Sequence, residues 1–374
     1  MAGEVAAHVL TDFSEIARLW KDAEAVHGAP QSLEWIDNWR AIVNADSFVV
    51  GLFHGTTPIL LVPLEAVSHR GVKIARYPGG SHANCNFPWL SKEFDGVAGR
   101  EAVNQLLGII RKVRPDIDAL SLTRQFSEMQ GAVNPLLALG KAPNPNPVLA
   151  VSLNGGFDAV LDRANRKRKL KKHRQHDRRY EESGGWRIDA PRSPAESEKV
   201  LDLFFAMKAQ RFRQMGISDP FSDENVRNFF KVFFCAGLTK DHQLNELRFL
   251  EVGGTIRSII GKVFGVAGPT VEFGAIAQDE LMTASPGEFL FFEDISRSCG
   301  EGHSVYSFGI GDEPYKREWC DIDLAIYDTL VPLSAKGRFF TALQSARNAV
   351  AGSLKRNPRL WGMAKALRSR FAKR

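Results

Sequence analysis

The chain has 374 residues, of which 44% are hydrophobic and 25% are charged, a balance typical of a globular protein with two domains. No apolar run approaches the ~20 residues of a membrane-spanning helix, and the N-terminus lacks the pattern of a secretion signal. The four cysteines show no metal-ligand spacing and no C-x-x-C pair. We therefore expect reduced thiols, no metal and a cytoplasmic location.

The formal net charge of +6 is unevenly distributed. Residues 334–374 hold eleven Lys or Arg and no acid, which leaves 38 basic against 43 acidic residues in 1–333. The body of the protein therefore carries a charge of about −5, which disfavours a uniformly basic nucleic-acid binder.

The first half of the chain predicts helices alternating with antiparallel strands. Helices are expected to begin at Asp12 and Ser32, because apolar residues follow each at helical spacing. The Pro-rich segment 143–147 predicts a crossover between domains. The other expected elements are strands at 5–10, 48–53, 59–67, 72–77 and 119–123, with helices at 100–113 and up to about 139.

The second half repeats this order of elements with little residue identity. Helices at 195–215 and 222–236 precede a hairpin over 247–264, a strand at 270–275, a loop and another helix. The predicted fold class is α/β (α+β), with two mixed, mostly antiparallel sheets in tandem, flanked by helices. The expected domains are 1–147 and 148–333, followed by a basic amphipathic tail, 334–374.

A Gly-rich loop at 78–87 carries His82, Asn84 and Asn86. Binding groups concentrate on such loops, so these three side chains are candidates for substrate contact. The alternative is a buried turn whose amides are satisfied internally. The residues alone leave both interpretations open.

A helix expected at 157–182 contains the basic run 166–174, which includes Lys169 and Lys172. Because positive charge lies on all sides, most of the helix must face solvent or a polyanion. The first interpretation is a solvated helix paired with nearby acids. The second is a site for diphosphate groups, acidic polysaccharide, RNA or anionic lipid. Only Tyr180 and Trp186 lie nearby to stack on bases, so specific DNA recognition is not indicated.

The segment 285–319 combines a helix start, a strand and a glycine turn. Ser285 is expected to cap the helix, Pro286 suits its first turn, and Glu288 suits its positive end. A strand at 305–310 then leads through a Gly-x-Gly turn to Tyr315-Lys316-Arg317-Glu318-Trp319. A helix whose first amides are uncovered by glycine forms a natural cradle for a diphosphate.

The Pro286-Gly287 pair before the helix and the Tyr-Lys-x-x-Trp sequence after the next strand resemble the GNAT-superfamily acyltransferases of the cellulose-biosynthesis CelD type. The resemblance extends to about Thr329, with a more distant similarity to the FemABX peptidyltransferases. It implies acyl transfer from acetyl-CoA or another acyl-CoA. The GNAT signature Arg/Gln-x-x-Gly-x-Gly/Ala is replaced here by residues 282–287.

The resemblance implies roles for particular residues. Tyr315 would be the general acid, Lys316 would hold phosphate or the oxyanion, and Glu272 would be the base. Arg211 would bind a substrate anion. The expected cofactor-binding residues are Ser285, Gly287, Glu288 and Phe289. Ordinary alternatives are aromatic packing for Tyr315, a surface lysine at 316, and a solvated acid at 272.

The tail predicts two basic amphipathic helices. Apolar residues recur at Phe339, Leu343, Ala346, Val350 and Leu354, and the pattern resumes after Pro358. Such helices bind anionic membranes, whereas a helix docked on the body or a frayed terminus is the alternative. The sequence thus predicts peripheral contact with the inner face of the membrane.

The functional hypothesis is a cytoplasmic acyltransferase that acts on an amine or hydroxyl of a cell-envelope or exopolysaccharide precursor. One alternative is a FemABX-like transferase that uses aminoacyl-tRNA, with the 157–182 helix as its RNA contact. Another is a non-catalytic scaffold of a membrane polysaccharide synthase.

Overall fold

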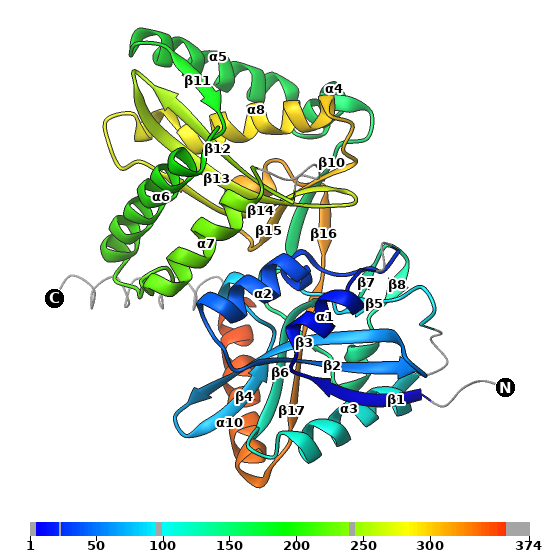
Figure 1. Cartoon of the computed structure of the whole chain (residues 1–374). Coiled ribbons are helices and arrows are strands. Elements are labelled where there is room, and N and C mark those ends of the chain that lie inside the picture. Colours follow the sequence, from blue (N-terminus) through cyan, green and yellow to red (C-terminus); the bar gives the residue numbers. More distant parts are fainter. Residues whose placement is uncertain (1–4, 22–23, 95–98, 239–243, 357–374) are drawn as a thin grey trace. The chain divides into compact units, whose positions relative to one another are not determined.

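The computed structural model of the chain describes residues 5–21, 24–94, 99–238 and 244–356 (Figure 1). Within these ranges the chain divides into two compact units, one formed by residues 5–146 and 325–356 and the other by residues 147–324. A helix long and apolar enough to cross a membrane is not found in the described ranges.

Unit 1 is built on a mixed sheet. Its strands lie in the order β1 (Val5–Leu10), β2 (Ser47–His54), β3 (Thr57–His69), β4 (Val72–Arg76), β6 (Ala119–Phe126), β17 (Ile326–Pro332) and β9 (Ala142–Pro143), while β5 (Trp89–Leu90) pairs with β3. Only β4 and β6 run parallel among these pairs. The helices of the unit are α1 (Phe13–Leu19), α2 (Leu33–Ile42), α3 (Gly99–Val113) and α10 (Ala335–Arg356).

Unit 2 repeats this architecture. Its strands lie in the order β11 (Trp186–Asp189), β12 (Asn245–Val252), β13 (Thr255–Gly265), β14 (Gly268–Ile276), β15 (Val305–Ile310), β10 (Val148–Ser152) and β16 (Ile322–Leu324). Again one pair, β14 with β15, is parallel. The helices are α4 (Gly156–Arg163), α5 (Arg166–Glu182), α6 (Pro194–Met215), α7 (Glu224–Ala236), α8 (Pro286–Gly300) and α9 (Pro314–Arg317). The expected fold class is thus confirmed.

The C-terminal limit of the second domain differs from the expectation. A boundary was expected at residue 333, but β17 pairs antiparallel with β6 of unit 1, with Val331 opposite Leu120. In unit 2 the equivalent place beside β15 is filled by β10. Each strand covers an otherwise open sheet edge. Local sequence predicts neither pairing, because β17 lies some two hundred residues beyond its partner.

Two helices also differ from the expectation. The helix predicted at 157–182 is divided into α4 and α5 at Asn165, which has a φ of 64° and accepts a hydrogen bond from the Arg168 amide. The helix predicted up to residue 139 is instead a hairpin, β7 (Glu128–Met129) and β8 (Ala132–Val133), followed by a 3-10 helix over Pro135–Leu139.

A buried ion network fixes α8 against the sheet of unit 2. The Lys262 amine, on β13, donates to both carboxylate oxygens of Asp294 on α8 at 2.7 and 2.9 Å, and it lies 2.9 Å from Glu246 on β12. The Tyr306 hydroxyl donates to the same Asp294 carboxylate at 2.7 Å. Burial and then Asp294 raise the pKa of Tyr306, so this phenol stays protonated.

Helix α10 docks on unit 1 through its first turns. Ser334 donates to the Asp118 carboxylate at 2.6 Å, and Gly337 is buried so close to the same residue that an added Cβ would lie 1.7 Å from the Asp118 carbonyl oxygen. Phe339 and Leu343 instead remain 76% and 43% exposed. The expected continuation of the stripe at Val350 and Leu354, and the segment 358–374, lie outside the described side chains.

Replacing Gly337 with Ala should therefore detach α10. The added methyl group meets backbone rather than a movable side chain, so a loss of about 2 kcal/mol in unfolding free energy is expected. Gly108→Ala on α3 is the control, because nothing lies within 4 Å of its Cβ position, and it should stabilise by up to about 1 kcal/mol. Denaturation would measure both variants, with limited proteolysis of α10. Unchanged proteolysis of Gly337→Ala would contradict the docking.

Candidate active site

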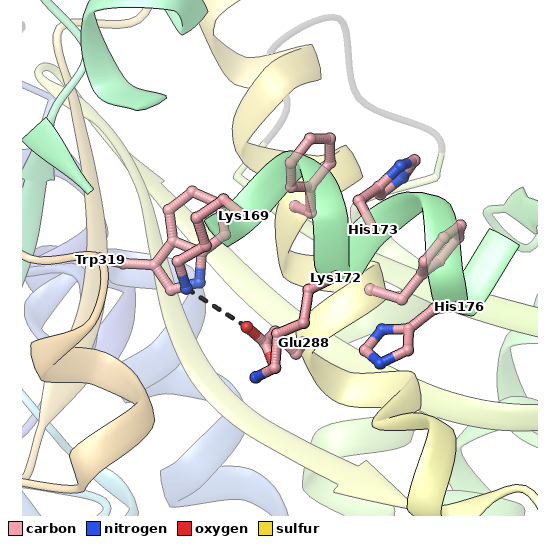
Figure 2. Close-up of a pocket in the computed structure, with 8 residues that line it drawn as sticks. Lys169, Lys172, His173, His176, Glu288 and Trp319 are labelled. Carbon is pink, nitrogen blue, oxygen red and sulfur yellow. Dashed lines mark hydrogen bonds and ion pairs between the residues drawn. The ribbon is translucent and has the colours of Figure 1, made fainter. Parts of the chain in front are cut away.

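The outer face of α8 is covered by the basic helix α5. Glu288, in the first turn of α8, accepts from Lys172 at 2.5 Å and from Lys169 at 3.3 Å. Figure 2 shows Lys169 reaching across Trp319 toward Glu288, and its amine lies 4.0 Å from the indole centroid. Lys169 is 3% exposed. The cavity between the helices measures about 10 Å³, space for one water molecule at most.

The pKa values in this contact reflect the balance of burial and pairing. Burial would raise the pKa of Glu288, but Lys172 and Lys169 outweigh it and lower the pKa. Burial lowers the pKa of Lys169 despite its two carboxylate partners, Glu288 and Glu318. Lys169, Lys172 and Glu288 therefore form an internal ion cluster, and none of them presents an open site between α5 and α8.

Aromatic packing continues this contact. The His173 ring stacks on Phe289 and Phe292 at centroid distances of 4.6 and 4.0 Å, and its Nε2 lies 2.6 Å from the Glu293 carboxylate. Phe289 is 1% exposed. Phe289, expected to bind the cofactor, thus lies in the hydrophobic core of unit 2.

The start of α8 differs from the expected diphosphate cradle. Ser285 is left-handed, with a φ of 51°, and its side chain makes no capping hydrogen bond. The amides of Glu288 and Phe289 both donate to the Ser285 carbonyl, at 3.0 and 3.1 Å, and Pro286 has no N–H. A Cβ at Gly287 would lie 3.1 Å from Ile276 Cγ2 on β14. Gly287 therefore allows α8 to lie close to the sheet.

A second cluster forms where β15 ends. Tyr315, 43% exposed, stacks on Phe291 at 5.8 Å and meets Phe308 edge-on at 6.1 Å. Burial of the phenol and then the charge of Glu313 raise its pKa, so its proton is retained at neutral pH. Lys316 is buried, and its amine donates to the Ile310 carbonyl at 2.8 Å and lies 2.9 Å from Glu313. Lys316 thus fastens α9 to the end of β15.

Lys208 and Arg211 of α6 act electrostatically on this second cluster. We use the name α6–α9 cluster for Lys208, Arg211, Glu313, Tyr315 and Lys316. The charge of Arg211 acts on both Lys208 and Tyr315, and those of Glu313 and Lys316 act on Lys208. Arg211 is exposed and Lys208 is half-buried. The sequence analysis assigned Arg211 but missed Lys208, although their spacing of three residues places both on one helix face.

The two parallel strands of unit 2 share a short ladder. The parallel ladder between β14 and β15 joins Thr270 to Ser307 and has no further pair in the described ranges. Gly309, at a φ of 68°, lies so close to β14 that a Cβ would be 2.7 Å from the Val271 carbonyl. Glu272 follows at once. It is the extra residue of a bulge, because Val271 pairs with Lys262 and Phe273 with Gly261, and bulges often re-aim residues beside active sites.

The three candidates in unit 1 lie on one loop. Asn86 is 1% exposed, its amide donates to the Thr123 carbonyl at 2.8 Å, and its oxygen accepts from Gln31 at 2.8 Å. This bonding fits the buried-turn interpretation. The Asn84 oxygen accepts from Arg124 at 3.4 Å, and the His82 ring lies 6.2 Å from that of Trp39. His82 and Asn84 remain predicted substrate contacts.

Unit 2 is a mixed sheet whose two parallel strands share one ladder pair in the described ranges, with Tyr315 packed at the end of β15. Residues 166–317 match the family model described as Acetyltransferase (GNAT) domain. The protein is therefore an enzyme of the GNAT acyltransferase type. A search of curated proteins found no match.

Solved structures with the same fold cover both units. FemX superposes with a TM-score of 0.57 at 10% identity, over 88% of this chain and 97% of its own. A conserved protein of unknown function from Bacteroides thetaiotaomicron gives 0.53 at 12%, over 85% and 97%. L-PGS from Bacillus licheniformis gives 0.51 at 10%, over 92% and 98%. At these identities the similarity establishes the fold alone.

Replacing Glu288 with Ala tests the ion cluster between α5 and α8. The buried Lys169 amine loses its 3.3 Å partner, so unfolding free energy should fall by about 2 kcal/mol at pH 7. Because pairing lowers the pKa of Glu288 in the folded state, this contribution is present above about pH 4.3 and is lost as the pH falls through the folded pKa.

The control for this prediction is Glu182→Ala, at the exposed end of α5. It should change stability by no more than about 0.5 kcal/mol. Denaturation curves at pH 7 and pH 3.5 would measure both variants. An equal loss for Glu288→Ala and Glu182→Ala would refute the assigned ion cluster.

Proposed function

We propose that the protein transfers an acyl group from acyl-CoA to an amine or hydroxyl of a cell-envelope or exopolysaccharide precursor, in the manner of the CelD-type acyltransferases. The observation that carries the proposal is that β14 and β15 share a single ladder pair, Thr270 with Ser307, while Tyr315 packs on Phe308 of β15. The Pro286-Gly287 and Tyr315-Lys316 sequences support the family assignment.

The opening suits an extended acyl donor. A chain that lies along the free side of β14 would add to the sheet as a strand does, through backbone hydrogen bonds. The acceptor then attacks the thioester carbonyl, and backbone N–H groups near the Glu272 bulge would hold the oxyanion. The CoA diphosphate would accept a hydrogen bond from the backbone N–H of Gly287, the first-turn amide that does not donate to the Ser285 carbonyl. Cations of α5 would also bind this diphosphate.

Tyr315 would protonate the leaving thiolate, a role supported by its 43% exposed phenol at the end of β15. Lys316 would act by holding α9, and Arg211 would bind an anionic group of the substrate. Glu272 is one candidate for the base that deprotonates the acceptor. His82 and Asn84 are proposed to bind acceptor groups from unit 1.

A second donor, aminoacyl-tRNA, is supported by the surface of α5. Lys167 and Lys171 have no hydrogen-bond or ion-pair partner in the part of the chain that the structure describes. They border an open groove of about 380 Å³, whose lining is Asn165, Lys167, Arg168, Lys171, Lys172 and Gln175. Phosphodiester backbones bind such cationic grooves. A non-catalytic scaffold remains the third hypothesis.

Calorimetric titration separates these hypotheses. Binding of acetyl-CoA supports the proposed donor, and binding of charged tRNA that weakens steeply with salt supports the alternative. A folded protein that binds neither would favour the scaffold.

The role of Tyr315 is tested by Tyr315→Phe. If the hydroxyl protonates the thiolate, kcat should fall by about 10²-fold or more while donor affinity stays unchanged, because ring packing on Phe291 and Phe308 is preserved. Steady-state kinetics and calorimetry would measure the two quantities. Full turnover in this variant would return Tyr315 to a packing role.

We also propose peripheral contact with an anionic membrane through α10. Phe339 and Leu343 lie on the side of α10 away from buried Gly337 and Thr341, with exposed Arg338 and Lys336 beside the stripe. An apolar stripe bordered by cations is the pattern of helices that lie in the membrane interface. Eleven cations from residue 334 onward, without an acid, add attraction to anionic lipid.

The double variant Phe339→Ser, Leu343→Ser should bind anionic liposomes at least tenfold more weakly than wild type, because it loses apolar burial but no charge. Sedimentation with phosphatidylglycerol vesicles, at rising salt, measures this binding. Val133→Ser is the control, since Val133 is a 68% exposed residue elsewhere in unit 1. Equal sedimentation of all three proteins, or none, would remove the membrane proposal.

A further inference from the structure

The Lys208 amine, in the α6–α9 cluster, has neither a hydrogen bond nor an ion pair in the described ranges. Its amine lies between two aromatic rings of its own helix, 5.8 Å from the centroid of Phe204 and 5.7 Å from that of Phe212. Phe204 in turn packs on Phe273 of β14 at 4.2 Å. Phe204 thus joins α6, which carries Lys208, to β14, the strand of the proposed donor site.

The structure points to Lys208 as the base that removes the proton from the acceptor, and this inference rests on the proposed acyl transfer. Lys208 shares the cluster with Tyr315, the proposed acid. Lys208 would then take the proton from the acceptor, and Tyr315 would donate a proton to the leaving thiolate.

Two cations and two acids act on the charge of Lys208. Arg211 lies one turn further along α6, and Lys316 lies on α9. The acids are Asp219, after α6, and Glu313, before α9. Asp219 already accepts from the Phe221 amide at 2.9 Å and lies 3.9 Å from Arg227. Glu313 pairs with Lys316. Neither acid therefore forms an ion pair with Lys208.

These surroundings favour the neutral amine. Burial is the largest cause, and Arg211 adds to it, which lowers the pKa of Lys208 to about 8. The ordinary value for lysine is about 10.4. At pH 7 to 8 an appreciable share of Lys208 molecules would hold a lone pair, which a proton acceptor requires.

The proposed transfer consists of acceptor attack followed by cleavage of the C–S bond. The acceptor oxygen or nitrogen forms a bond to the thioester carbon, and its proton passes to the Lys208 amine. The C–S bond then breaks, and the Tyr315 phenol gives its proton to the sulfur. Lys208 leaves the cycle as an ammonium and Tyr315 as a phenolate, so one proton passes between them through solvent before the next turnover.

The first test needs no activity. Brief reaction with acetic anhydride at pH 6 to 11, followed by peptide mass spectrometry, gives the titration of each amine. Lys208 should be half-reactive near pH 8, and exposed Lys199 on the same helix is the internal reference. Lys208 titrating with Lys199 would overturn the inference.

The second test uses turnover. Lys208→Arg keeps the positive charge but cannot act as a base at neutral pH, so kcat should fall at least 10²-fold. Lys208→Ala should lose the acidic limb of the kcat/KM profile and regain activity with added propylamine, a recovery that a structural role would not produce. Lys199→Ala is the control and should keep wild-type kinetics.

Glu272→Gln distinguishes the competing base. It should retain the acidic limb if Lys208 is the base. Loss of the limb in Glu272→Gln, with its retention in Lys208→Ala, would assign the role to Glu272 and overturn the inference. A wild-type protein that binds neither donor would refute the proposed function, and the base assignment with it. A normal labelling pKa alone would refute only the role of Lys208.

Discussion

The buried ion pair between Lys262 and Asp294 is the constraint on which the arrangement of unit 2 depends. Both side chains are 1% exposed, and removal of one partner of such a pair typically costs 3–5 kcal/mol. The pair ties β13 to α8, while Tyr306 ties the same carboxylate to β15. The buried Asp294 carboxylate therefore joins β13, α8 and β15.

Helix α8 is consequently packed on two sides. Gly287 allows its first turn to approach Ile276 on β14, and Glu288 is held by Lys169 and Lys172 of α5. Two cations of the basic helix thus pair with an internal carboxylate. Lys167 and Lys171 instead border the open groove, where an external anion is proposed to bind. The same helix therefore contributes to the stability of unit 2, and anion binding by its outer face stays a prediction.

The proposed acyl transfer takes place where β14 and β15 share a single ladder pair in the described ranges. The parallel pair ends at Thr270 and Ser307, the bulge at Glu272 follows, and α9 is anchored nearby by the buried amine of Lys316. Burial keeps Tyr315 protonated but favours the neutral form of Lys208. Burial thus has opposite effects on the charge of the two groups, because it disfavours the phenolate of Tyr315 and the ammonium of Lys208.

The sequence alone determined the repeated order of elements, the fold class, and the position of the Tyr315-Lys316 motif, because hydrophobic periodicity and turn residues act locally. Tertiary structure decided the rest. The pairing of β17 with β6 joins segments distant in the chain, the role of Gly287 depends on how near Ile276 lies, and Phe289 was assigned by its stacking with His173. The sequence does not distinguish Lys208 from other lysines, because its burial and the charges near it exist only in the folded chain.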